Sequence, residues 1–133
     1  MQRTVPGAPA AGLLRHIARA TAAAGSEITL RIVGSADATR LNARYRKKAQ
    51  PTNVLSFSYG LPHGDVVLCH PLIAREAKRQ GKSLRAHYAH LVVHGILHLR
   101  GHDHSTRRDA ARMERAEIRI LRRLGFGDPY ASG

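Results

Sequence analysis

The sequence contains few of the residues that build disulfide frameworks, membrane spans or base-stacking surfaces: it has one cysteine, no tryptophan, four tyrosines and two phenylalanines. A single cysteine excludes an intramolecular disulfide. Cys69 follows three apolar residues, which predicts a small buried side chain and not a reactive thiol. The scarcity of aromatic rings argues against a protein that binds single strands by stacking their bases. No apolar run approaches the ~18 residues of a transmembrane helix, so we expect no membrane partner.

Acidic residues are also scarce, because nine Asp and Glu stand against 22 Lys and Arg, giving a formal net charge of +13. Most of the basic residues are arginine, whose planar guanidinium binds phosphate through paired hydrogen bonds. This excess of positive charge favours a polyanionic partner such as nucleic acid. One cluster lies within residues 40–48. A second cluster, at helical spacing, consists of Arg108, Arg112, Arg115, Arg119 and Arg122, and it fits either a nucleic-acid contact or a solvated helix face.

At 133 residues the chain is expected to fold as one domain that spans residues 1–133. Hydrophobic periodicity, capping residues and glycine or proline stops predict both helices and strands. The expected helices cover residues 8–24, 35–45, 71–81, 83–100 and 106–124, with Ser83 as the cap of the fourth and Ser105 or Thr106 as the cap of the fifth. The expected strands cover residues 28–33, 54–57 and 65–69. The strands lie in the first half, and only helices follow them. This order predicts an α+β domain in which a small mixed sheet is covered by helices.

Residues 94–104 carry the most informative pattern, because three histidines there have the spacing of a metal site. His94 and His98 are four residues apart, so their imidazoles lie on the same face of a helix. Gly101 allows the helix to end and turn, and His104 beyond the turn can supply a third ligand. Three protein nitrogens leave a fourth position for water, as in catalytic zinc sites. The spacing therefore predicts a zinc ion held by the helix and the following turn.

The same segment departs from known zinc helices in one respect. Five of the nine histidines lie between positions 90 and 104, so some pairing can arise by chance. The order of ligands and glycine nevertheless matches the metzincin signature, which favours a zincin-like site. Gly95 stands where zincin helices carry the glutamate that acts as general base. The nearest acidic candidates for a base are Asp103, Asp109 and Glu114. Asp103 fits equally well as a turn residue or as a hydrogen-bond acceptor for a ligand histidine.

At its motifs the sequence resembles the YbeY endoribonucleases, also called rRNA maturation factors. Residues 94–104 look like the signature of that family. The likeness continues over residues 41–48, 51–57, 64–69, 76–81, 86–90 and 124–130, in the order in which the family has these blocks. It spans roughly residues 27–130. Two features differ from the family: the loop between Phe57 and Gly64 is short, and the last expected helix is rich in arginine.

The resemblance implies a bacterial, cytoplasmic, zinc-dependent endoribonuclease that cleaves single-stranded RNA, with one Zn²⁺ ion per chain. It further implies a role in 16S rRNA 3′-end maturation and ribosome quality control. The implied partners are the 16S rRNA precursor and the small ribosomal subunit, and no DNA. The metal ligands of the family correspond to His94, His98 and His104. Its important arginine corresponds to Arg46, which is expected to face the metal across a cleft and to offset charge on the phosphate during cleavage.

Two other functions remain compatible with these residues. A zincin peptidase would use the same ligand spacing, although Gly95 replaces its glutamate. A non-enzymatic RNA-binding protein of ribosome assembly would use zinc only to hold the helix to the turn. This second alternative predicts that replacing Arg46 leaves function intact, whereas reversing charges within residues 108–122 abolishes it. The metal also stays open, because three imidazoles accept nickel, copper or iron as well as zinc.

Overall fold

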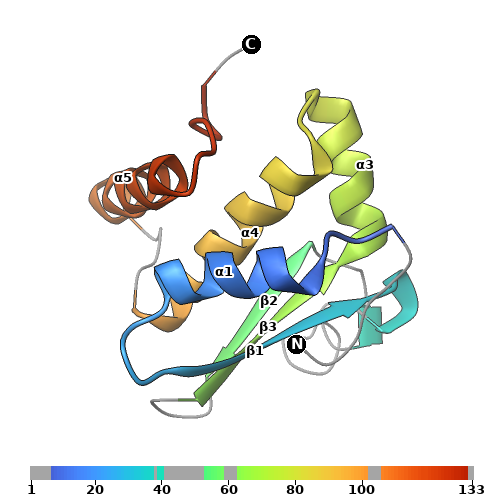
Figure 1. Cartoon of the computed structure of the whole chain (residues 1–133), viewed down its shortest axis with the longest axis horizontal. Helices are drawn as coiled ribbons and strands as arrows, with labels where there is room; N and C mark the ends of the chain where they lie inside the picture. The colour runs from blue at the N-terminus through green and yellow to red at the C-terminus, as the bar shows by residue number, and fades with distance from the viewer. Residues whose placement is uncertain (1–6, 38, 41–52, 59–62, 102–105, 132–133) are drawn as a thin grey trace.

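A computed structural model describes residues 7–37, 39–40, 53–58, 63–101 and 106–131. The described residues form a sheet of three strands, β1 (Glu27–Val33), β2 (Val54–Ser58) and β3 (His63–Cys69), in the order β1-β3-β2. Strand β1 pairs with β3 in parallel, and β2 pairs with β3 antiparallel. The sheet is therefore mixed, and helices lie against it (Figure 1). The α+β architecture predicted from the sequence is confirmed.

The helices follow the predicted order with small shifts at their ends. They are α1 (Ala11–Thr21), α3 (His70–Gln80), α4 (Leu84–Leu99) and α5 (Arg107–Arg123). Helix α1 begins later than predicted, after Pro9, because proline disfavours the helical conformation in the residue before it. Of the helix predicted over residues 35–45, residues 35–37 and 39–40 are helical, and residues 41–45 lie outside the described part. No helix among the described residues is long and apolar enough to cross a membrane.

The sheet buries apolar side chains on both faces. Alternate residues of a strand point to opposite faces, so Leu30 of β1 and Val66 of β3 share one face. That face joins the main core, whose other members come from α1, α3, α4 and α5. The opposite face holds a smaller cluster of Val33, Leu55, Val67 and Cys69. Cys69 is 1% exposed, which confirms the prediction of a buried thiol.

Helix α4 occupies the centre of the fold, since it packs against α1, α3, α5 and two strands of the sheet. Its sequence is apolar on nearly all sides, which is typical of a fully surrounded helix. The Ser83 side chain accepts a hydrogen bond from the Ala86 amide and so caps the helix, as predicted. After Arg100 the chain reverses at Gly101, whose φ of +96° is one that glycine adopts readily. The predicted helix stop before His104 is confirmed.

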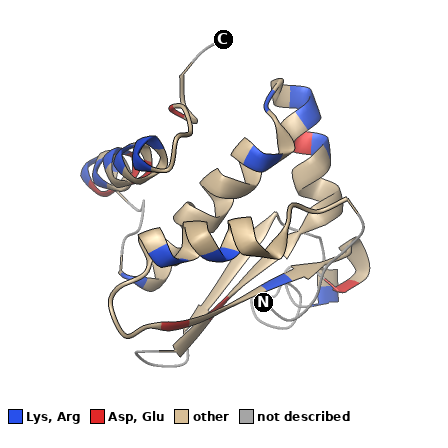
Figure 2. Cartoon of the chain, viewed as in Figure 1, with Lys and Arg blue, Asp and Glu red and all other residues tan. Residues whose placement is uncertain are grey.

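Helix α5 is amphipathic, with a buried inner face and a basic outer face. It begins at Thr106, one of the two predicted caps, whose side chain accepts a hydrogen bond from the Asp109 amide. The inner face packs on α4 and buries Met113, Ala116, Glu117, Ile120 and Leu121. The outer face carries the predicted arginine stripe, formed by the exposed residues Arg108, Arg112, Arg115, Arg119 and Arg122, and Figure 2 shows this concentration of positive charge. One charged residue, Glu117, lies on the buried inner face, away from the solvent that a carboxylate usually contacts.

Candidate metal centre

His94 and His98 lie side by side near the C-terminal end of α4. Their ring centroids are 4.8 Å apart and the rings are nearly perpendicular to each other. This arrangement follows from their four-residue spacing, which places the second ring one turn above the first. The predicted pairing of these two imidazoles is therefore present. Both side chains are only partly buried, so the two rings are accessible from one side of the helix.

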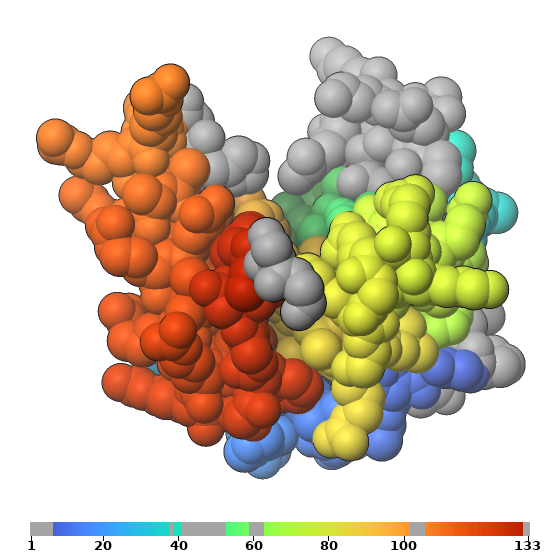
Figure 3. Space-filling model, turned by 90° about the horizontal axis from the view of Figure 1, so that it is seen from above, coloured from blue at the N-terminus to red at the C-terminus, as the bar shows by residue number. Residues whose placement is uncertain are grey.

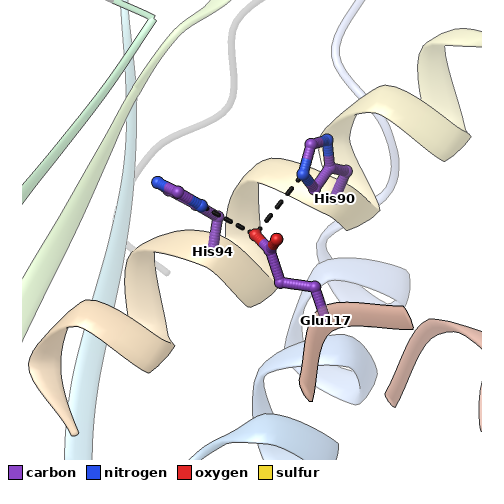
Figure 4. Close-up of side chains that lie close together, drawn as sticks. All are labelled: His90, His94 and Glu117. Atoms are coloured by element: carbon purple, nitrogen blue, oxygen red, sulfur yellow. Dashed lines mark hydrogen bonds and ion pairs between the residues drawn. The ribbon is translucent and has the colours of Figure 1, made fainter. Parts of the chain in front are cut away.

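The His94 ring is fixed by Glu117, which reaches it from the inner face of α5. The Nδ1 atom of His94 lies 2.7 Å from the Oε2 atom of Glu117. Because a carboxylate only accepts hydrogen bonds, Nδ1 carries a hydrogen, and in the neutral form of the ring the lone pair is therefore on the opposite nitrogen, Nε2. Figure 4 shows that the far edge of the His94 ring points away from Glu117. Hydrogen bonding of one ring nitrogen to a carboxylate is the usual state of a metal-binding histidine.

Glu117 has two further partners that hold it in place. The hydroxyl of Tyr130 donates a hydrogen bond to Oε1 of Glu117, and Nε2 of His90 lies 3.4 Å from Oε2. The Glu117 side chain is 0% exposed, which makes these partners necessary for a buried charge. Burial alone would raise the pKa of Glu117, but the hydrogen bonds from His90, His94 and Tyr130 outweigh it and lower the pKa to about 2. Glu117 is therefore an anion that receives three donors.

Tyr130 and His90 contact each other as well as Glu117, so the three side chains form one cluster. Burial, followed by the hydrogen bond to Glu117 and the charge of that residue, raises the pKa of the Tyr130 hydroxyl, so it remains a donor. The His90 and Tyr130 rings meet edge to face at 5.2 Å. A cavity of about 350 Å³ lies beside this cluster and is lined by His94, Ala110, Met113, Glu114, Glu117 and Tyr130. The C-terminal segment thus borders both the carboxylate and the open side of His94.

The space-filling view shows the same region from outside (Figure 3). The orange and red atoms of α5 and the C-terminal segment lie on one side, and the yellow-green atoms of α3 lie on the other. The surface is hollowed between them. Lys82, between α3 and α4, donates a hydrogen bond of 2.8 Å to the Pro129 carbonyl, which ties the C-terminal segment across this gap.

Two groups of side chains are candidates for holding a metal ion. The first is the predicted set of His94, His98 and His104, of which His94 and His98 are described and His104 lies outside the described residues. The second is His90, His94 and Glu117, whose nearest ligand atoms all lie within 4.8 Å of one another. Imidazole nitrogens suit a borderline ion such as Zn²⁺, so the donor chemistry of the His94 and His98 pair fits the predicted metal. Arg46, the predicted catalytic residue, also lies outside the described residues.

The packing around Gly95 explains why this helix has no glutamate at the position where zincins carry one. Its position faces the sheet, and a Cβ atom there would meet Val66 Cγ1 at 2.9 Å and Ser56 Oγ at 3.1 Å. Ser56 Oγ also donates a hydrogen bond of 2.9 Å to the Gly95 carbonyl. A glutamate at this position would enter the core between the helix and the sheet. The residue that serves as a base in zincins therefore has no counterpart at position 95 of this helix.

The sequence did not point to the acidic residue that contacts the site. Of the three candidates, Asp103 lies outside the described residues, and Glu114 is exposed on α5. Asp109 is in the first turn of α5, where its amide bonds to the helix cap. Glu117 instead contacts His94. One signal was available, because Glu117 follows Met113 by four residues and precedes Ile120 and Leu121 on the apolar stripe of α5. Tyr130 had no comparable signal, since it lies beyond the helix.

Comparisons with known proteins show to which family the chain is similar. The family model described as Endoribonuclease YbeY matches residues 9–125. Endoribonuclease YbeY of Aromatoleum aromaticum is 49% identical over 126 residues, which cover 92% of this chain and 82% of the relative. Endoribonuclease YbeY of Laribacter hongkongensis is 54% identical over 115 residues, covering 80% of this chain and 69% of the relative.

A solution structure from Thermotoga maritima resembles the fold. It superposes with a TM-score of 0.55 at 20% sequence identity and covers 90% of this chain and 87% of the other. At this identity the likeness concerns the fold alone. The family match over most of the chain, together with relatives at about half identity, establishes that the chain belongs to the YbeY endoribonuclease family.

Proposed function

We propose that this protein is a zinc-dependent endoribonuclease that hydrolyses phosphodiester bonds in single-stranded RNA. The observation that carries the proposal is the pair of neighbouring imidazoles on α4, one of which has its Nδ1 hydrogen bonded to a buried carboxylate. His94, His98 and His104 would hold one Zn²⁺ ion per chain. When bound, the ion supplies Lewis acidity and lowers the pKa of water, so that a nucleophile forms near neutral pH.

The other groups of the chain would bind and orient the RNA. Arg46 would hold a non-bridging phosphate oxygen and offset the negative charge that develops during cleavage. The arginine-rich outer face of α5 and the net charge of +13 would attract the phosphate backbone before it reaches the site. Because few aromatic side chains are present, we expect phosphate contacts to contribute more to affinity than base stacking.

We further propose that the protein acts in the cytoplasm as a single domain spanning residues 1–133. Its substrate there would be the 16S rRNA precursor on or near the small ribosomal subunit, in 3′-end maturation and quality control. No DNA partner is expected. A non-enzymatic role in ribosome assembly is the main competing function, with the zinc ion holding α4 to the turn that follows it. A peptidase function is disfavoured because the Gly95 position has no room for the zincin glutamate.

The decisive experiment compares His98→Gln with the wild-type protein in metal content and RNA cleavage. We expect the wild type to retain one zinc ion per chain and to cleave a fluorescent single-stranded RNA, but not the same sequence as single-stranded DNA or as duplex RNA. His98→Gln should lose most zinc and reduce cleavage at least about a hundredfold, since removal of a ligand disrupts the site. His16→Gln is a matched control, because His16 is exposed on α1.

Three results would contradict this proposal. Full cleavage by the metal-free wild type would exclude zinc chemistry. Stoichiometric zinc and RNA binding without any cleavage, together with wild-type behaviour of Arg46→Ala, would instead support a non-enzymatic role with structural zinc. Hydrolysis of an unfolded protein at an enzymatic rate would support the peptidase.

A further inference from the structure

We propose that Glu117 is a positioning residue for the metal site, and that Tyr130 of the C-terminal segment holds Glu117 in its working orientation. Glu117 would keep His94 in the Nδ1–H form and direct Nε2 toward the metal, without binding the metal itself. The inference rests on the proposed function only in taking His94 as a metal ligand. It assigns a task to α5 and to the chain beyond it, which supply none of the expected ligands.

The first support for this role is the place of Glu117 in the fold. It is fully buried on the face of α5 that packs against α4. A carboxylate at such a position is costly unless it is hydrogen bonded. The Glu117 side chain is 0% exposed, so the groups that hold it are protein donors and not solvent. Its position is therefore set by packing, and it can set the position of the ring that donates to it.

The second support is the distribution of its hydrogen bonds. Tyr130 donates to Oε1, so that oxygen is turned away from His94. The other oxygen, Oε2, receives Nδ1 of His94 at 2.7 Å and faces Nε2 of His90 at 3.4 Å. Both oxygens thus have donors within the protein. A metal ion bound at Oε2 would displace these donors, whereas an ion bound at Nε2 of His94 leaves them in place.

The third support is the way in which Tyr130 is itself held. The Tyr130 amide donates a hydrogen bond of 2.8 Å to Oδ1 of Asp128, and the neighbouring Pro129 carbonyl accepts from Nζ of Lys82 at 2.8 Å. Nε2 of His90 also lies 3.2 Å from the Tyr130 hydroxyl. The segment after α5 is therefore held at two places, at Lys82 just before α4 and at Glu117 itself. Tyr130 thus has a fixed position from which it can orient the Glu117 carboxylate.

The test reads the tautomer of His94 in the metal-free protein by ¹⁵N NMR and measures zinc affinity by competition with a chelator. The wild type should show the Nδ1–H form alone. Glu117→Gln can donate or accept at this position, so we expect a mixture of tautomers and a zinc affinity lowered by about 10–100-fold. Tyr130→Phe keeps the ring and removes only the hydroxyl, and we expect a smaller loss of several-fold. Glu27→Gln is the matched control, because it removes an exposed carboxylate at the start of β1, outside the cluster around His94.

Two outcomes would overturn the inference. One is a wild-type tautomer and wild-type zinc affinity in Glu117→Gln, which would make the hydrogen bond irrelevant to the metal. The other is loss of zinc in His90→Gln with retention in His98→Gln, which would make Glu117 a ligand in the alternative group. Failure of the proposed function is distinguishable, since a protein that binds zinc as predicted but never cleaves RNA would refute only the catalytic role. Tyr130→Phe keeps the test valid if Glu117→Gln folds poorly.

Discussion

Helix α4 donates hydrogen bonds from two of its histidines to two carboxylates on different neighbouring helices. On the α3 side, Nε2 of His87 lies 3.0 Å from Oε1 of Glu76. On the α5 side, Nδ1 of His94 lies 2.7 Å from Oε2 of Glu117. The two pairs thus contain the same chemical groups at similar nitrogen–oxygen distances. The two pairs differ in which ring nitrogen is engaged and in what surrounds the other one.

The His87 side chain is 5% exposed, whereas the His94 side chain is 25% exposed. With Nε2 engaged by Glu76, the remaining Nδ1 of His87 is buried and has no hydrogen-bond partner among the described residues. With Nδ1 engaged by Glu117, the remaining Nε2 of His94 points away from that residue, and the partly exposed ring lies beside His98. A carboxylate–histidine pair therefore stabilises the fold in the first case. In the second case, on the proposal made above, it orients Nε2 of His94 toward a metal ion.

The largest effect on stability should come from a third carboxylate beside α4, placed where no imidazole can donate a hydrogen bond to it. Gly95→Glu places a charge between the helix and the sheet, where a Cβ atom alone already meets Val66 at 2.9 Å. We expect a loss of more than about 4 kcal/mol in the free energy of unfolding, because overpacking and an unpaired buried charge combine. Urea unfolding followed by circular dichroism measures this loss. Gly95→Ala should cost about 1–3 kcal/mol. A stable, folded Gly95→Glu protein would contradict the packing described for this face.

Removal of the sealed pair, His87 and Glu76, should reduce stability and leave the metal site intact. Glu76→Ala leaves the buried Nε2 of His87 without its acceptor and removes the partner of the Asn53 amide. We expect a loss of about 2 kcal/mol in the free energy of unfolding, the cost of an unsatisfied buried donor. Zinc affinity should equal that of the wild type. If Glu76→Ala instead weakened zinc binding as much as Glu117→Gln, the distinction between the two pairs would be wrong.

The sealed pair should also make stability depend on pH. Burial lowers the pKa of His87 from its usual 6.5, and the hydrogen bond and charge of Glu76 offset this only partly; the positive charges of His90 and Lys82 add to the lowering. Well above pH 6.5 the ring is neutral in both the folded and the unfolded states. As the pH falls below 6.5, the unfolded chain binds the proton first, so stability decreases.

The measurement is the urea midpoint at pH 7.5 and at pH 5.5, which we expect to be lower at pH 5.5. His87→Gln should reduce this difference. Burial also lowers the pKa of His70, which acts in the same direction, so some pH dependence should remain. An unchanged pH dependence in His87→Gln would show that the sealed ring makes no contribution.

Much of the fold could be predicted from the sequence because its signals are local. Ser83 and Thr106 mark helix starts through their own side chains, and Gly101 marks a helix stop through its positive φ. His94 and His98 share a face because of the four-residue period of the helix. Each of these features depends on a few neighbouring residues. They can therefore be predicted without knowledge of the tertiary structure.

The support of the site could not be predicted in the same way, because it depends on contacts between distant segments. Glu117 lies 23 positions from His94 in the sequence, and nothing local indicates that α5 packs on that side of α4. Its place in an apolar stripe marks it as buried but does not name its partner. Tyr130 follows α5 in a segment without periodicity. The roles of His104 and Arg46 stay predictions, since both lie outside the described residues.

The smallest effect on stability should come from the outer face of α5, opposite Glu117. Replacing Arg112, Arg115 and Arg119 together by glutamine changes only exposed or partly exposed side chains, so we expect the free energy of unfolding to change by no more than about 0.5 kcal/mol. Cleavage of a short oligonucleotide should also be unchanged. For a long single-stranded RNA, the dependence of log affinity on log salt should become shallower by about 0.7 for each phosphate that the variant no longer neutralises.

The matched control replaces three exposed basic residues near the junction of α3 and α4, Lys78, Arg79 and Arg85, by glutamine. It removes the same total charge from a different surface. A shallower salt dependence in the α5 variant alone would identify its outer face as a phosphate-binding surface. An equal change in both variants would mean that only the overall field matters, and the outer face of α5 would then be a solvated surface. In either case the inner face of α5 would differ from the outer face, because the Glu117 carboxylate there accepts hydrogen bonds from specific donors.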